Sequence, residues 1–331
     1  MTPMALFWAS ALALTILLYV LLDGFDLGVG ILFGITRDES QRRSMIDAIA
    51  PLWDGNETWL VLAGATLFAV FPSGYALLMS AFYLPVIIML AGLILRGVAF
   101  EFRERTRHMR WLWDAGFVFG SLAATFMQGL MIGALVAGVP VSDGQYVGGD
   151  TSWLSPFAVL CGLGLVFGYT LLGAAWLVRK CEGPLRERAY RQLPRLVGAC
   201  AAVLGAVFAY ALASNLQVTD RWMEQPGLFV LPALGVLSAI FLIRGIRRRT
   251  DALPFRMAAL GFVAAFATLA ASFWPYLVPF SVTIAETAAP PSTLSFMFWG
   301  AGIIIFPITL IYSTVNYLMF RGKSTSRSAY D

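Results

Sequence analysis

Two pairs of acidic residues lie where apolar stretches leave little room for charge. Asp23 and Asp26 close the first long apolar stretch, and Asp54 and Glu57 open the second. The acids of each pair are three residues apart, so they share one face of a helix. Charged side chains inside a membrane span are costly, and they usually face the helix bundle and mark an ion or proton route. Burial and mutual repulsion favour the protonated form of a carboxyl group, so these acids can take up and release protons.

Two structural interpretations of the same acids stay open. Asp54 and Glu57 also fit an acidic variant of the capping box, with aspartate at the N-cap and glutamate at N3. Asp23 and Asp26 can instead serve only as structural partners of Arg96, a basic residue near the end of the third apolar stretch.

The composition shows which elements must position these residues. Of 331 residues, 59% are hydrophobic and 13% are charged, whereas soluble domains carry about 25% charged residues. This excludes an ordinary soluble enzyme and predicts an all-α polytopic membrane protein, formed by one integral membrane domain over residues 1–331. Spans need about 20 apolar residues each. The pattern predicts nine membrane-spanning helices, near residues 6–34, 53–72, 75–100, 114–138, 155–179, 194–214, 228–246, 255–275 and 295–320.

The second predicted helix has to include its acidic residues. From Trp59 to Phe71 the apolar run has only 13 residues, about 20 Å of helix at 1.5 Å per residue. That length does not cross about 30 Å of hydrocarbon. A start at Trp53 lengthens the helix to about 28 Å, and it draws Asp54 and Glu57 into the membrane region.

Basic residues alternate between the predicted connections. All but one of the 23 lysines and arginines lie in or beside the first, third, fifth and seventh connections or in the C-terminal tail, and Arg221 is the exception. The positive-inside rule therefore predicts an N-terminus outside and a C-terminus in the cytoplasm. Since topology explains the basic surplus, we expect no nucleic-acid partner. The third connection and the tail contain Arg103, Arg105, Arg107, Arg110, Arg321, Lys323 and Arg327.

This topology places the candidate residues at similar depth. The first acid pair lies toward the cytoplasmic end of the descending first helix, and the second pair lies in the first turns of the rising second helix. Arg96 reaches the same level in the third helix, with Glu101 slightly lower. We therefore expect four carboxylates and one arginine to share a layer in the cytoplasmic leaflet, where Arg96 holds one partner ionised.

The chain offers few ligands for a metal or a haem. His108 is its single histidine and lies in an arginine-rich loop, and the three cysteines form no CxxC pair. The pattern excludes iron–sulfur and structural zinc sites, and it predicts no metal site and no haem ligand from this chain. An odd number of cysteines also argues against a disulfide framework. The cysteines are Cys161, Cys181 and Cys200.

Short motifs surround the acidic residues. Residues 23–30 have the sequence Asp-Gly-Phe-Asp-Leu-Gly-Val-Gly, and residues 49–57 have the sequence Ile-Ala-Pro-Leu-Trp-Asp-Gly-Asn-Glu. They resemble the DGFD-x-G-x-G and IAP-x-WDGNE signatures of subunit II of the cytochrome bd-type quinol oxidases. Further matches at residues 95–103, 279–284 and 320–323 extend the resemblance over nearly the whole chain. Glu57 and the run that follows Arg96 are most similar to the cyanide-insensitive branch, since other members carry glutamine at the Glu57 position.

The resemblance implies a heterodimer with a homologously folded subunit I in the bacterial cytoplasmic (inner) membrane. Subunit I would hold all the haems, two of type b and one of type d or a type-b replacement. The complex would oxidise quinol and reduce O2 to water with protons from the cytoplasm, without pumping. For this chain the resemblance implies nine spans, packed as two four-helix bundles and a peripheral helix. A structural quinone, which some members hold, and small accessory subunits are further candidate partners.

The resemblance also assigns roles to single residues. Acids that match Asp26 and Asp54, and an arginine that matches Arg96, influence haem incorporation or activity in the family. The Asp54 position is implicated in a proton path into subunit I. The expected roles are proton transfer for Asp54 and Glu57, indirect support of the partner's haem for Asp26, Asp54 and Arg96, and a structural part in the acid layer for Asp23 and Glu101.

Two other classes of function compete with this one. A secondary transporter could use the acid and arginine layer as a coupling-ion site, but transporters often show paired repeats and broken helices at the midplane. Here the acids lie off-centre, and no repeat is visible. A structural partner subunit would use its acids only for assembly. Co-purification with a haem-rich subunit separates an oxidase subunit from a transporter, and full turnover of an Asp54→Asn enzyme would favour the structural partner.

Overall fold

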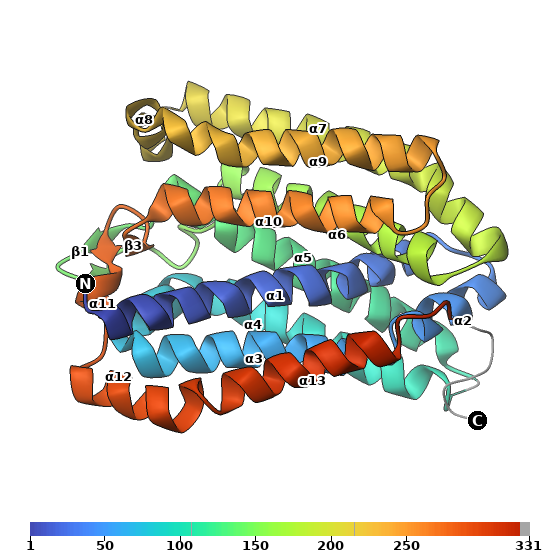
Figure 1. The fold of residues 1–331 in the computed structure, drawn as a ribbon, viewed down its shortest axis with the longest axis horizontal. Helices are drawn as coiled ribbons and strands as arrows, with labels where there is room; N and C mark the ends of the chain where they lie inside the picture. Colours follow the sequence, from blue (N-terminus) through green and yellow to red (C-terminus); the bar gives the residue numbers. More distant parts are fainter. Residues whose placement is uncertain (107, 215, 325–331) are drawn as a thin grey trace.

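Long helices that run side by side form most of the molecule (Figure 1). The computed structural model describes residues 1–106, 108–214 and 216–324. Arg107 and Arg327, two of the basic residues behind the predicted topology, lie outside the described residues. The helices at the predicted spans are α1 (Pro3–Gly34), α3 (Trp53–Val70), α4 (Pro72–Arg103), α5 (Arg110–Ala137), α6 (Pro156–Lys180), α7 (Gly183–Ala213), α9 (Val230–Arg247), α10 (Leu253–Phe273) and α13 (Ile305–Met319).

Eight helical segments of the described chain are long and apolar enough to cross a membrane. This confirms the prediction of an all-helical polytopic membrane protein. The 18-residue helix α3 is not among the eight, because its first turns contain Asp54, Asn56 and Glu57. It begins at Trp53, as the length argument requires, and it packs against α1 and α4.

Short elements fill the connections. At one end of the molecule, the connections that follow α5 and α10 form two antiparallel hairpins, which the sequence did not reveal. They consist of β1 (Val141–Ser142) with β2 (Gln145–Tyr146), and of β3 (Tyr276–Val278) with β4 (Val282–Thr283). The remaining short elements are α2 (Glu39–Asp47), α8 (Gln217–Glu224), η1 (Pro226–Phe229), α11 (Ile284–Thr287), α12 (Pro291–Met297) and the π-helical turn η2 (Phe298–Gly302).

Three helices differ from the predicted spans for local reasons. Helix α4 is kinked at Phe82, which has non-helical backbone angles (φ −121°, ψ 19°), three residues before Pro85. Proline cannot donate a helical hydrogen bond, and its ring clashes with the preceding turn. The last predicted span is divided into α12, η2 and α13. Helix α7 begins at Gly183, well before the apolar run at residues 194–214, because its polar first turns are also helical.

Helix α1 lies in the interior and packs against α3, α5 and α6. Its closest neighbour is α6, and glycine makes that approach possible. A Cβ atom on Gly28 would lie 1.8 Å from the carbonyl oxygen of Tyr169, and one on Gly173 would lie 2.5 Å from the carbonyl carbon of Gly28. Such distances are far inside van der Waals contact, so both positions require glycine. The two backbones thereby place the acidic end of α1 deep in the protein.

Basic side chains gather at the end of the molecule where α1, α4 and α6 finish. Arg103 at the end of α4 contacts Glu39 of α2, and Arg188 of α7 donates to the carbonyl of Ile35. Lys180 at the end of α6 donates to the carbonyl oxygens of Phe320 and Gly322, which follow α13. In Figure 1 this end, marked by α2, lies opposite the end where α1 begins. The helix ends that the sequence assigns to the basic side therefore lie together at one end of the molecule.

Candidate functional site

Arg96 joins two acids in the interior of the helix bundle. Its Nη2 atom lies 2.8 Å from Oδ1 of Asp23, and it also donates a hydrogen bond to Glu57. Asp23 is fully buried, and the side chain of Arg96 is 3% exposed. Glu57 retains 26% exposure and thus reaches from the protein surface to this buried pair. Helices α1, α3 and α4 each contribute one member, so the ion pairs connect three helices.

Asp26 has a different polar partner. Nδ2 of Asn56 donates to Oδ2 of Asp26 at 2.7 Å and to the carbonyl of Leu22 at 3.1 Å. The hydroxyl of Tyr317, on α13, donates to Oδ1 of Asn56 at 3.0 Å. Because Tyr317 supplies a donor to the amide oxygen, the amide nitrogen of Asn56 must point toward Asp26. Helix α13 therefore takes part in the site even though it lies at the edge of the molecule.

A second hydrogen-bonded group lies one turn before Asp23 along α1. Tyr19 lies one turn before Asp23 on α1, and its hydroxyl accepts a 2.8 Å hydrogen bond from Nε2 of Gln128. The hydroxyl of Tyr169 donates to Oε1 of the same glutamine at 3.0 Å. The three side chains are buried and come from α1, α5 and α6. Gln128 thus makes the interhelical hydrogen bonds that favour glutamine inside a membrane protein.

The charges of this site do not balance. Asp23, Asp26 and Glu57 are three carboxyl groups, whereas Arg96 is the one guanidinium that contacts them in the described chain. Oδ1 of Asp26 and Nε and Nη1 of Arg96 have no hydrogen-bond partner there. Buried polar atoms are nearly always paired, and excess negative charge is costly in a low-dielectric interior. The site is therefore suited to binding protons.

Asp54 and Glu101 lie apart from this group. Asp54 is exposed and forms no ion pair within the described residues. Glu101 lies 4.0 Å from Arg105, one turn later on α4, and is 42% exposed. The structure thus brings Asp23, Asp26, Glu57 and Arg96 together, while Asp54 remains on the surface one turn before Glu57.

The capping-box interpretation of Asp54 and Glu57 is wrong. The N-cap of α3 is Leu52, and no side chain caps this helix end. Asp54 is the second helical residue, and its backbone carbonyl accepts from Thr58. The helix starts earlier than the motif requires because the turns at residues 48–52 lead directly into it. Neither acid therefore has a capping role.

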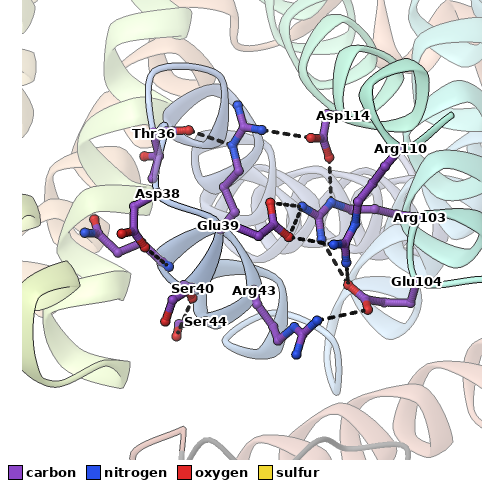
Figure 2. A network of polar contacts seen from close by, with 12 residues as sticks. Thr36, Asp38, Glu39, Ser40, Arg43, Ser44, Arg103, Glu104, Arg110 and Asp114 are labelled. Carbon is purple, nitrogen blue, oxygen red and sulfur yellow. Dashed lines mark hydrogen bonds and ion pairs between the residues drawn. The ribbon is translucent and has the colours of Figure 1, made fainter. Parts of the chain in front are cut away.

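A network of ion pairs at the basic end joins α2, α4 and α5 (Figure 2). Arg103, which is 1% exposed, contacts Asp114 at 2.6 Å, Glu39 at 2.9 Å and Glu104 at 2.9 Å. Arg42 adds a second contact to Asp114 at 2.8 Å. Since Arg103 follows Arg96 by two turns on α4, the network fixes the helix segment that carries the buried guanidinium.

The chain contains one histidine, His108, as a possible haem ligand. His108 is exposed in the connection between α4 and α5. Within residues 1–106, 108–214 and 216–324, no three or more His, Cys, Asp or Glu residues are grouped so that they could hold a metal ion. The donor set that a bis-histidine or histidine–methionine haem would need does not fit the residues present. The predicted absence of a haem ligand stays a prediction.

Sequence reasoning missed several parts of the site. Asn56 was given no role, although its position between two acids in a short span was a signal. Tyr317 could not be found, because its contact with Asn56 joins segments 261 residues apart. Arg103 was counted only as a topological charge, although its spacing of seven residues from Arg96 places both on one helix face.

Comparisons with known proteins agree with the motifs. Residues 4–320 match the family model described as cytochrome bd terminal oxidase subunit II. The chain is 31% identical to cytochrome bd-I ubiquinol oxidase subunit 2 of Escherichia coli strain K12, over 96% of this chain and 94% of the relative. It is 28% identical to cytochrome bd ubiquinol oxidase subunit 2 of Bacillus subtilis, over 96% and 95% of the two chains. A chain in the structure of bd oxidase from Geobacillus thermodenitrificans has a similar fold, with a TM-score of 0.79, 16% identity and coverage of 96% and 99%.

Proposed function

Because the chain belongs to the cytochrome bd terminal oxidase subunit II family, we propose that it pairs with a haem-bearing subunit I that oxidises quinol and reduces O2 to water. Membership makes it a subunit of a membrane-bound oxidoreductase complex, and its apolar helices make it a multi-pass protein of the bacterial cytoplasmic membrane. The partner's haems, when bound, carry the electrons and activate O2. The proposal assigns to this chain the supply of protons and the support of the haem site.

The proposed topology has nine spans, an outer N-terminus and a cytoplasmic C-terminal end. Helix α3 supports a ninth span, since it lies along α1 and α4 and is drawn into the bundle by the Glu57–Arg96 contact. The start of α1 and the end of α13 lie at opposite ends of the molecule, as an odd number of crossings requires (Figure 1). The gathering of basic residues at the α13 end supports a cytoplasmic location of that end.

The proposed arrangement is two four-helix bundles and a peripheral helix, and the packing of the helices supports it. Helices α1, α3, α4 and α5 pack on one another, and so do α6, α7, α9 and α10. The contact between α1 and α6, with Gly28 and Gly173 at its closest point, joins the groups. Helix α13 reaches the first group through Tyr317 and through Asn316, whose Nδ2 donates to the carbonyl of Pro51 at 3.0 Å.

The proposed proton path is carried by one observation, the buried group of three carboxyls around Arg96. Asp54 would accept protons at the surface near the basic end. Glu57, partly exposed and one turn further into the membrane, would receive them next. Asp23 would stay ionised beside Arg96, and a proton could then move between the carboxyl groups of Glu57 and Asp26. Uptake from the cytoplasm for water formation, with electrons from quinol oxidised at the outer face, would separate charge without pumping.

Support of the partner's haem would be indirect. Asp26 and Arg96 would act by fixing the packing of α1, α3 and α4, whereas the exposed Asp54 makes no buried contact of this kind within the described residues. A partner surface that rests on these helices would lose its shape when the buried contacts are removed. The expected consequence is loss of haem from subunit I together with loss of assembly.

Expression of the chain alone and with its subunit I tests the proposed function. The chain alone should show no haem bands in the reduced-minus-oxidised spectrum, because its described residues provide no fitting ligand set. The co-expressed complex should purify with haem and consume O2 when given quinol. Haem bound by the chain alone, or failure to co-purify with subunit I, would contradict the proposal.

A further inference from the structure

Arg179 and Arg256 are two of several arginines at the basic end that have no acidic partner among the described residues. Arg179 lies in the last turn of α6, and Arg256 lies in the first turn of α10. Within the part of the chain that the structure describes, neither side chain forms an ion pair or a hydrogen bond. The guanidinium carbon of Arg179 lies 5.5 Å from the ring centre of Phe255, the residue next to Arg256, so the two positive charges lie where α6 and α10 pack on each other. Like charges repel, so an anion beside them would be stabilised.

Aromatic rings hold Arg179 in place. Its guanidinium carbon lies 5.7 Å from the ring centre of Trp176, which is 2% exposed. Trp176 stacks on Phe25 at 4.2 Å and donates from Nε1 to the carbonyl of Ala48 at 3.0 Å. Arg179 is therefore half-buried against aromatic side chains, whereas the unpaired Arg191 and Arg195 of α7 are exposed. A side chain that is already ordered loses less entropy when it binds a ligand.

The neighbouring charges are already engaged. Lys180 is buried and donates to the carbonyls of Phe320 and Gly322. Asp251, the acid that precedes α10, contacts Arg186 at 2.5 Å and Lys323 at 2.7 Å. Asp251 is therefore not free to pair with Arg179 or Arg256 in place of an external anion. Lys180 is not free to compete with these arginines for such an anion.

We propose that Arg179 and Arg256 bind the phosphate of an anionic phospholipid at the membrane surface. Guanidinium groups match phosphate oxygens in geometry and charge. Both arginines lie where membrane-spanning helices end, which is the depth of lipid headgroups, and indole rings favour the same level. Basic pockets between spans at the cytoplasmic face bind anionic headgroups. Inorganic phosphate offers the same anionic chemistry without acyl chains, so the experiment must distinguish the two sources.

Native mass spectrometry of the purified oxidase complex, stripped of lipid by detergent, tests the site. Phosphatidylglycerol, phosphatidylcholine with the same acyl chains and inorganic phosphate are titrated separately. The parent complex should bind one phosphatidylglycerol. The Arg179→Gln/Arg256→Gln variant should bind it with an affinity that is lower by about tenfold or more, as expected when charged hydrogen bonds are lost. The Arg191→Gln/Arg195→Gln variant removes the same charge from the same end and should bind like the parent. Arg256→Gln alone, at an exposed position, provides a variant that folds if the double variant does not.

Each outcome decides the proposal. Equal binding by the parent and by the Arg256→Gln or double variant would overturn it, and so would an equal loss in the Arg191→Gln/Arg195→Gln control. Equal affinity for phosphatidylcholine would overturn the preference for an anionic headgroup. Displacement of the lipid by inorganic phosphate at similar concentrations would assign the phosphate site to a soluble anion. Separation of the two subunits in the Arg256→Gln variant would overturn the proposal in favour of a partner carboxylate.

Discussion

The guanidinium of Arg96 lies 2.8 Å from the carboxylate of Asp23, and the two buried side chains join α4 to α1. A buried charge pair stabilises a fold only weakly as a pair, but removal of one partner leaves the other charge uncompensated. This contact also receives Glu57 from α3. Arg96 therefore links three helices through two acidic side chains.

Arg96→Leu should impair assembly. Loss of the guanidinium leaves Asp23 as an unpaired buried charge, a cost of about 3–5 kcal/mol. We expect poor yield of the complex or loss of haem rather than a purely kinetic defect, measured by haem content and thermal unfolding. Arg105→Leu is the control, since Arg105 is 75% exposed and its one ion pair, with Glu101, is long at 4.0 Å. A fully assembled and fully active Arg96→Leu enzyme would show that Asp23 needs no positive partner.

Tyr317→Phe should weaken the orientation of Asn56. The variant keeps the ring beside Phe25 and Trp176 but removes the donor to the amide oxygen. An unpaired buried acceptor costs about 1–3 kcal/mol, so the complex should unfold at lower temperature while haem content is retained. Tyr312→Phe, at a 55% exposed position on the same helix, is the control. Equal melting temperatures for the Tyr317 and Tyr312 variants would refute the role of the hydroxyl.

Arg103→Met should open the network at the basic end. Methionine fills the space over Phe33 but leaves Glu39 and Asp114 without their buried cation. We expect a loss of about 1–3 kcal/mol, because Glu39 is partly exposed and Arg42 and Arg110 still contact the two acids. The lower unfolding temperature should persist at high salt because the buried side chain of Arg103 is poorly screened. Arg43→Met, whose 61% exposed side chain lies 3.8 Å from Glu104, should cause little change. A loss that is the same for both variants would mean that burial of Arg103 is unimportant.

Asp251 should make the attachment of the C-terminal end sensitive to acid. Slight burial alone would raise the pKa of Asp251. Hydrogen bonds from Lys323 and Arg186 outweigh this effect, and the pKa of Asp251 lies below its ordinary value. A lowered pKa in the folded state contributes stability above the unfolded-state value, about 3.9, and this stability is lost as the pH falls through the folded pKa. The parent should therefore lose its stability advantage over Asp251→Asn below about pH 4. Curves of unfolding temperature against pH that stay parallel would contradict this prediction.

The spans and the acid-bearing helix ends could be predicted because apolar length and charge placement are local properties. The contact between Arg96 and the acids could be predicted from their common depth. The partners of Asp26 and Asn56 could not be, since they depend on how α1, α3 and α13 rotate about their axes. The sequence placed Asp54 beside the buried acids by depth alone, whereas a helix exposes successive residues to different surroundings, and Asp54 is directed outward while Asn56 is directed inward. The hairpins after α5 and α10 were missed because their strands have only two or three residues.

A role for Asp54 in proton uptake is the central claim, and turnover of an Asp54→Asn complex tests it most directly. The exposed side chain forms no ion pair within the described chain and does not cap α3, so an amide of nearly the same shape should leave assembly and haem content unchanged. An amide cannot carry a proton as a carboxyl does, so the rate of O2 consumption with saturating quinol should fall severalfold, while Asp54→Glu keeps part of the rate and Glu101→Gln keeps all of it. The account would be contradicted if the Asn and Glu variants both had normal haem content and turned over like the parent. Asp54 would then have no part in proton uptake.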